Sequence, residues 1–201
     1  MTMRFLAISA VLVMTVAAFA GVVHKDDFEV GIDPVSQKIK VEYDPDLFPF
    51  PLPPSDFPLL TGWALDDPGF VSLDADEQIP GEFEPLPPGR VIGLRVLAVS
   101  SPEFKVWDPL GPGEPGFQIQ GSNLWTIGAA PFDRHPVWHI DSSDPAYNPA
   151  NGPWSVTFEL IDLTPGLSVG LLPSDPVTVT FIPEPASLAL LVLAGTLIRR
   201  R

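Results

Sequence analysis

The amino-acid sequence predicts an all-β protein, a single β-sandwich with immunoglobulin-like proportions and proline-rich loops. Between residues 21 and 181, short runs rich in Val, Ile, Phe and Trp alternate with clusters of Pro, Gly, Asp and Ser. No segment of this region keeps an apolar period of about 3.6 residues, which a surface helix would need. The chain also contains 26 prolines. Because proline breaks helix interiors, we expect no helix longer than two turns between residues 21 and 181.

Eight segments carry the strand pattern. Residues 91–99 (VIGLRVLAV) are apolar on nearly every position, as in a central strand that is covered on both faces. Residues 155–163 alternate apolar and polar side chains, with Val156, Phe158 and Leu160 on one face. The predicted strands are 27–32, 38–43, 91–99, 104–107, 117–120, 137–140, 155–163 and 177–181.

Residues 44–90 are the least strand-like part of this region. Proline cannot donate a hydrogen bond to a strand ladder, and this segment contains DLFPFPLPPSDFP and EPLPPG. We expect extended loops here, with Phe48, Phe50, Phe57 and Trp63 packed onto the edge of the sandwich.

The first twenty residues read as an export signal. Arg4 precedes an apolar run that begins at Phe5, and Ala18-Phe19-Ala20 has the small-x-small form that signal peptidase cuts. A transmembrane anchor is the alternative, but the run is short and no stop-transfer charges follow it. The sequence predicts residues 1–20 as a signal peptide, with cleavage after Ala20.

The last twenty residues join a Pro-Glu-Pro tripeptide, an uncharged run and a basic end. As a helix, residues 186–198 would span roughly 20 Å, short of the ~30 Å hydrocarbon core of a bilayer. We expect a short transmembrane helix that tethers the chain transiently to the inner membrane, with its arginines in the cytoplasm. The parts are Pro183, Glu184 and Pro185, then residues 186–198, then Arg199, Arg200 and Arg201.

This arrangement resembles the PEP-CTERM sorting signal of Gram-negative bacteria in the type, order and spacing of its three parts. The resemblance implies recognition by exosortase, cleavage near the tripeptide, and release or transfer into the cell envelope or exopolysaccharide matrix. An ordinary tail anchor is the alternative. The expected organisation is a signal peptide (1–20), an exported β-sandwich domain (21–181) and the sorting signal (182–201).

The composition of the predicted exported domain disfavours several classes of function. Seven Lys and Arg residues against 25 acids give residues 21–198 a formal charge of −18, which disfavours nucleic acid as a partner. The chain has no cysteine, so it has neither a thiol nucleophile nor a thiolate metal site. It also lacks a P-loop. The patterns G-x-S-x-G (residues 166–170) and G-x-G-x-x-G (residues 111–116) do occur, but neither is followed by a helical pattern, and both motifs need a strand-to-helix turn. We therefore expect no enzyme, although paired carboxylates for glycoside cleavage stay open.

The histidines are the candidate metal ligands. His24, His135 and His139, with Asp133 or Asp141 nearby, have the donor types of a zinc or copper site. Such a site requires a turn at Pro136 that brings His135 and His139 together, and strand pairing that adds His24. The alternative is that they are ordinary surface or loop histidines. Calcium is a second possible cation, because three acidic clusters offer several oxygens each. These clusters are Asp44 and Asp46; Asp74, Asp76 and Glu77; and Asp141 and Asp144.

A weaker resemblance covers most of the mature chain. The segments HKDDFEVGI, GWALDDPGF, VIGLRVLAV, FKVWDP, HPVWHID, WSVTFELID and SDPVTVTF are similar, in this order, to choice-of-anchor surface proteins described as Zur-repressed PEP-CTERM proteins. It implies an extracellular β-domain linked to zinc scarcity. Those relatives have a tighter His-x-His pair than His135 and His139, and this departure puts an inherited metal role in doubt.

Together these observations predict a non-enzymatic, exported surface or exopolysaccharide-associated protein. The alternative function is an extracellular zinc-binding protein that uses its three histidines. Sugar stacking is a further possible role for tryptophan, although most of the five are expected in the core. They are Trp63, Trp107, Trp125, Trp138 and Trp154.

Overall fold

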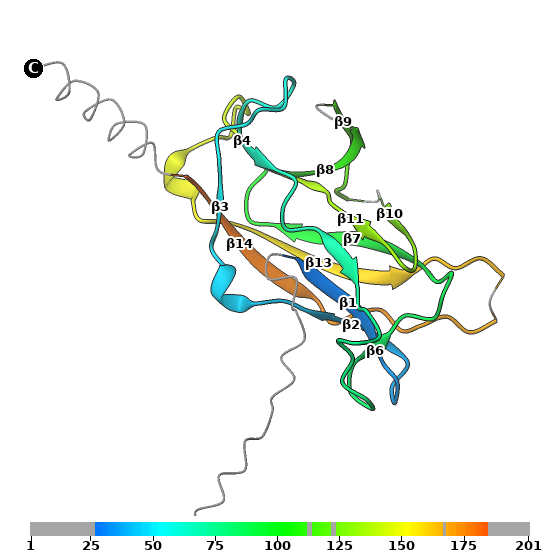
Figure 1. The fold of residues 1–201 in the computed structure, drawn as a ribbon. Helices are drawn as coiled ribbons and strands as arrows, with labels where there is room; N and C mark the ends of the chain where they lie inside the picture. Colours follow the sequence, from blue (N-terminus) through cyan, green and yellow to red (C-terminus); the bar gives the residue numbers. More distant parts are fainter. Residues whose placement is uncertain (1–26, 112–113, 122–123, 167, 185–201) are drawn as a thin grey trace, which may run out of the picture.

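The computed structural model describes residues 27–184, apart from 112–113, 122–123 and 167 (Figure 1). These residues form 14 strands and two short 3₁₀ turns, and the described part of the chain contains no α-helix. The prediction of an all-β protein is confirmed.

The strands follow one another with short connections. In chain order they are β1 (Phe28–Asp33), β2 (Lys38–Glu42), β3 (Phe50–Leu52), β4 (Gly62–Leu65), β5 (Phe70–Ser72), β6 (Glu84–Pro85), β7 (Val91–Val99), β8 (Phe104–Gly111), β9 (Glu114–Gln118), β10 (Leu124–Ala129), β11 (Asp133–Arg134), β12 (Val137–Asp141), β13 (Trp154–Asp162) and β14 (Val177–Pro183). The 3₁₀ turns are η1 (Pro45–Leu47) and η2 (Pro149–Asn151).

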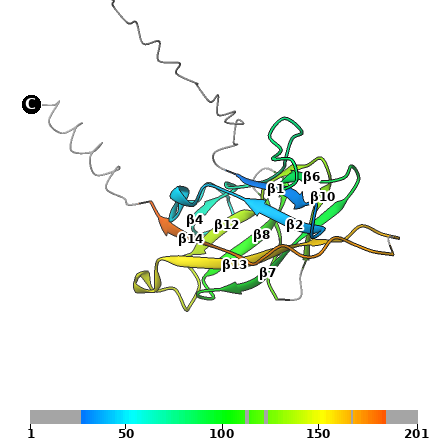
Figure 2. The same ribbon diagram turned by 90° about the horizontal axis from the view of Figure 1, so that it is seen from below.

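The strands pair into three sheets. Sheet A has the order β11-β5-β1-β2, with β6 also paired to β1; sheet B has β10-β7-β13-β14-β3; and sheet C has β4-β12-β8-β9. Most pairs are antiparallel, but β1 pairs with β5 and β14 with β3 in parallel. Figures 1 and 2 show β13 and β14 running beside β1 and β2, two segments that are far apart in the sequence.

All three sheets contribute side chains to one core. The ring of Phe28 on β1 lies 5.2 Å from that of Phe158 on β13, and the ring of Trp138 on β12 lies 5.2 Å from that of Phe181 on β14. These four side chains are fully buried. Sheet B therefore packs against both sheet A and sheet C, and large aromatic side chains supply much of the buried apolar area.

The alternating patterns place the strands as predicted. In β13, Trp154, Val156, Phe158 and Leu160 are buried and the residues between them are less so. β7 has the predicted bounds and lies between β10 and β13. The expectation that both of its faces are covered is wrong, because Ile92, Leu94 and Val96 are buried whereas Leu97 is 45% exposed. β8 extends beyond its predicted end, to Gly111. It contains Pro109, where its register with β9 shifts because proline has no N–H to donate.

The prediction that residues 44–90 form only loops is wrong. This segment contains β3, β4, β5 and β6, and β5 lies between β1 and β11. Proline is absent from β5, while Pro51 lies in β3, at the edge of sheet B, where a missing donor costs little. Strand β10 was also not predicted. The expected packing of Phe48, Phe50, Phe57 and Trp63 against the core is confirmed.

The described chain ends inside sheet B. β14 runs on to Pro183, which pairs with Leu52 of β3, and the N–H of Glu184 donates to the carbonyl oxygen of Leu52 at 2.8 Å. The predicted signal peptide, with Ala18 and Ala20, lies outside the described residues, as do Pro185, residues 186–198 and Arg199, Arg200 and Arg201. No helix in the described ranges is long and apolar enough to span a bilayer.

Candidate metal centre

One end of sheet A brings together two carboxylates and one imidazole. Asp27, Asp67 and His135 each offer a ligand atom, and these atoms lie within 4.8 Å of one another. All three residues are half-buried. Across the part of the chain that the structure describes, this is the one group of three or more His, Asp or Glu residues with such spacing.

Strand register brings the three residues to one place. Phe70 of β5 pairs with Phe28 of β1 on one side and with Arg134 of β11 on the other. Asp27 comes directly before Phe28, and His135 directly after Arg134. The turn that carries Asp67 leads into Phe70. Three distant segments therefore meet at the same end of the sheet.

Gly69 makes this close approach possible. Its N–H donates to Asp27 Oδ1 at 2.6 Å, and its carbonyl accepts from the N–H of Phe28 at 2.9 Å. A Cβ at this position would lie only 2.4 Å from His135 Nδ1, so any side chain here would displace the ring. The turn is also held by Trp138, whose Nε1–H donates to the carbonyl of Pro68 at 2.9 Å.

The imidazole of His135 faces oxygen atoms on both sides. Nδ1 lies 2.9 Å from the carbonyl oxygen of Asp66 and 3.0 Å from Asp67 Oδ1, and Nε2 lies 2.9 Å from Asp133 Oδ1. Burial by itself would lower the pKa of His135, but the negative charge of Asp27 and the bonds to Asp133 and Asp66 outweigh it and raise the pKa. Burial raises the pKa of Asp67, although His135 opposes this.

His139 lies in a different environment. It is 1% exposed in β12, its Nδ1 accepts from Trp107 Nε1–H at 3.3 Å, and its Nε2 lies 3.0 Å from the carbonyl oxygen of Thr61. The indole can only donate and the carbonyl can only accept, so the ring is neutral with its proton on Nε2. Burial lowers the pKa of His139 in agreement with this assignment.

The predicted ligand set is therefore divided in the structure. His135 lies beside Asp133, as the sequence suggested. Both ring nitrogens of His139, in contrast, form hydrogen bonds within the protein, with Trp107 and Thr61. His24 lies outside the described residues. Asp27 and Asp67 were not among the predicted ligands. No signal in the spacing pointed to them, because strand pairing alone brings these distant aspartates to His135.

The acidic clusters considered for calcium have other roles. Asp44 caps η1 by accepting from the N–H of Asp46 at 2.9 Å. Asp141 and Asp144 bind the ammonium of Lys105 at 2.6 and 2.9 Å. Burial would raise the pKa of Asp141, but bonds from Lys105 and Ser143 lower it to about 2.

The remaining acidic cluster, formed by Asp74, Asp76 and Glu77, lies largely at the surface. Asp74 and Asp76 are exposed and Glu77 is half-buried. Their oxygens do not form a three-ligand group among the described residues.

The five tryptophan side chains lie in the core or pack against it. Trp125, Trp138 and Trp154 are buried, and Trp63 and Trp107 are half-buried against core residues. Trp63 stacks on Tyr147 with 6.1 Å between ring centroids. The five side chains therefore do not form an exposed row of sugar-stacking platforms.

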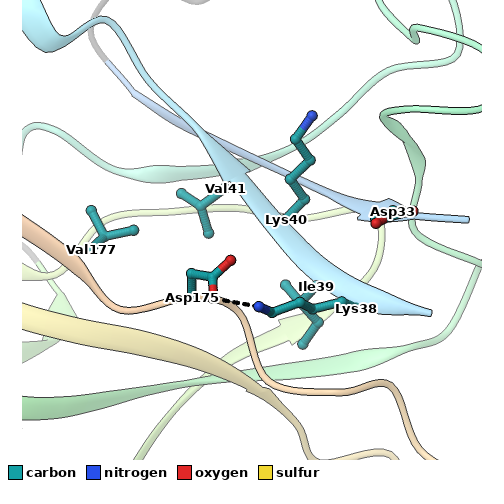
Figure 3. A pocket seen from close by; sticks show the side chains of 7 residues that line it. All are labelled: Asp33, Lys38, Ile39, Lys40, Val41, Asp175 and Val177. Carbon is teal, nitrogen blue, oxygen red and sulfur yellow. Dashed lines mark hydrogen bonds and ion pairs between the residues drawn. The ribbon is translucent and has the colours of Figure 1, made fainter. Parts of the chain in front are cut away.

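A shallow depression lies elsewhere, beside β2. It has a volume of about 280 Å³. Figure 3 shows Lys38 and Asp175 joined across it, while the ammonium of Lys40 extends away. Lys40 pairs instead with Glu42 at 2.7 Å. Because both of its lysines are already paired with carboxylates, this depression is a weaker candidate than the cluster around His135. Its lining residues are Asp33, Lys38, Ile39, Lys40, Val41, Asp175 and Val177.

Comparison with models of known protein families, with curated proteins and with solved structures found no match to this chain.

Proposed function

We propose that this chain is a non-enzymatic, exported β protein, sorted through its Pro-Glu-Pro segment and retained in the cell envelope or exopolysaccharide. Signal peptidase removes residues 1–20, and residues 186–198 tether the body to the inner membrane until exosortase cuts near Pro183-Glu184-Pro185. The basic end, Arg199 to Arg201, holds the tether on the cytoplasmic side.

One observation carries the proposal: the tripeptide, the short apolar run and the basic end occur in order in the sequence, and the tripeptide starts with the last residue of β14. Pro183 is the last residue of β14, and the N–H of Glu184 donates to the carbonyl oxygen of Leu52 in β3. Proline fixes φ and disfavours helix in the residue before it, which keeps the chain extended at this junction. An extended backbone is the form that a processing enzyme binds.

The sandwich interpretation is part of the same proposal. Sheet B forms one layer, and sheets A and C together form the facing layer, as the rings of Phe28, Trp138, Phe158 and Phe181 support. Such a body is held by its apolar core, which suits an exported protein without cysteine.

The test compares the full native chain with a triple variant, Pro183→Ala, Glu184→Ala and Pro185→Ala, in the native host. We expect the native chain to lose its arginine end and leave the inner membrane. The variant should keep that end and stay in the membrane fraction. Mass spectrometry of both termini and immunoblots of the fractions provide the measurement.

A matched control is Pro87→Ala with Pro88→Ala, which removes two prolines from an exposed turn of the body. It should be processed like the native chain. Sorting through the tripeptide is refuted if the triple variant is processed at the native rate. It is also refuted if the native chain collected outside the cell still carries Arg199 to Arg201.

A further inference from the structure

We propose that Asp27, Asp67 and His135 bind one divalent transition-metal ion of the zinc class. This site is independent of the sorting segment and goes beyond the proposed function. It also differs from the three-histidine set, with which it shares only His135.

The donor set favours a borderline metal. One imidazole nitrogen and two carboxylate oxygens are ligands that Zn²⁺ and its neighbours accept in four-coordinate sites. Calcium prefers six to eight oxygens and magnesium six, so an imidazole at the centre of the group disfavours both. Three protein ligands leave a fourth position for water or the carbonyl oxygen of Asp66.

The spacing suits a tetrahedral ion. With bonds of about 2.0 Å, the ligand atoms around zinc lie roughly 3.3 Å apart. His135 Nδ1 and Asp67 Oδ1 are 3.0 Å apart, and Asp27 supplies an oxygen within the 4.8 Å limit of the group. Small side-chain movements therefore suffice to form the site.

The surroundings orient the ligands. Asp133 Oδ1 lies 2.9 Å from His135 Nε2, so this nitrogen can donate its proton to a carboxylate while Nδ1 turns toward Asp67. A carboxylate behind a metal-bound histidine is the usual outer-shell arrangement, since it selects the tautomer and raises ligand basicity. The N–H of Gly69 similarly holds one oxygen of Asp27.

Charge and access also favour a cation. Among the described residues, His135 is the only basic group that forms an ion pair with Asp67 or Asp133. The side chain of His135 is 31% exposed and that of Asp67 is 48% exposed, so an ion can enter from solvent. The surrounding body is strongly acidic, which raises the local concentration of cations.

The experiment is a calorimetric titration in which zinc is added to the metal-free full chain in detergent. Co²⁺ serves as a second probe, because its visible absorption reports nitrogen and oxygen ligands in a four-coordinate site. We expect one Zn²⁺ per chain and a thermal midpoint that rises when zinc is added. Asp67→Asn and His135→Gln should each weaken zinc by more than about 100-fold, beyond the outer-shell effect of about 10- to 100-fold expected for Asp133→Asn.

Two controls isolate the site. Asp76→Asn removes one charge from an exposed acidic loop and should bind zinc like the native chain. His139→Gln should also retain zinc, whereas a three-histidine site would lose it. The far-UV circular dichroism of each metal-free variant confirms that the body is folded.

The inference is overturned if the native chain takes up no stoichiometric zinc, or if folded Asp67→Asn and His135→Gln bind it as the native chain does. Equal competition by Ca²⁺ would also overturn it. None of these results bears on cleavage at Pro183-Glu184-Pro185, so a failure here and a failure of the sorting proposal can be told apart.

Discussion

Glu103 provides the sharpest test of how this body is held together. It lies between β7 and β8, is 0% exposed, and forms no ion pair with a basic residue among the described interactions. Its carboxylate instead accepts from the hydroxyl of Ser101, from Asn151 Nδ2 at 2.8 Å and from Trp154 Nε1 at 3.0 Å. The perturbation is Glu103→Gln, which keeps the shape and removes the charge.

The contribution of the Glu103 charge to the free energy of unfolding follows from the pKa of this carboxyl group. Burial by itself would raise the pKa of Glu103, but the hydrogen bonds from Ser101, Asn151 and Trp154 outweigh it and lower the pKa from 4.5 to about 2. A shift of that size corresponds to about 3 kcal/mol. Asn151 is exposed, so solvent screening reaches the carboxylate, and we discount the contribution to about 2 kcal/mol.

The sign of the pH dependence is defined. The pKa is lower in the folded state, so the stabilisation is fully present above the unfolded-state pKa of 4.5. It falls as the pH drops from that value and is lost below about pH 2, where the folded-state carboxyl is itself protonated. The difference in stability between the native chain and Glu103→Gln should therefore disappear as the pH falls from 4.5 to about 2.

The assay is urea unfolding followed by tryptophan fluorescence, at neutral pH and at several values down to pH 3. At neutral pH we expect Glu103→Gln to be less stable than the native chain by about 2 kcal/mol, because the amide places an N–H₂ among donors. The difference should shrink on acidification. Glu82→Gln, at an exposed position, serves as the control and should change stability by less than about 0.5 kcal/mol. The reasoning fails if Glu103→Gln matches the native chain at neutral pH, or if the difference does not narrow at low pH.

Two further predictions concern the core around β12. Lys105→Met leaves the buried carboxylate of Asp141 without its cation and should lower the free energy of unfolding in urea by about 2 kcal/mol at neutral pH. Lys40→Met, at the more exposed pair with Glu42, should lower it by less than about 0.5 kcal/mol. Equal effects would contradict the role of Lys105. In the metal-free chain, nitrogen-15 NMR should find His139 neutral with its proton on Nε2, and His135 should keep its charge to higher pH than His139, because acids surround His135 and burial dominates at His139. The opposite order of titration would contradict the described environments.

The long, regular strands could be predicted from local patterns. β7 has the predicted bounds, and β13 differs by one residue at each end. Both have nine residues: β7 is a long apolar run rich in Val, Ile and Leu, and β13 shows a clear two-residue period. β3, β5 and β6 have only two or three residues each, too few to show a period. They are strands because distant partners supply their hydrogen bonds. Leu52 of β3, for example, pairs with Pro183 of β14 and accepts a hydrogen bond from the N–H of Glu184.

The candidate metal centre could likewise be predicted only in part from the sequence. The sequence identified His135 and its neighbour Asp133 by residue type, and it grouped His139 with them for the same reason. Only the packing of Trp107 and Thr61 around His139 places that ring in the core. Asp27 and Asp67 join His135 because β5 pairs with both β1 and β11.

By itself, then, the sequence determined the all-β class, the alternating faces of the long strands, the acidic charge and the order of the signals expected at the two ends. Each of these depends on residue type and on spacing along a few neighbouring residues. The tertiary structure decided the three-sheet topology, the buried state of His139 and the meeting of Asp27, Asp67 and His135. These depend on contacts between distant segments, whose hydrogen-bond partners and burial no local pattern specifies.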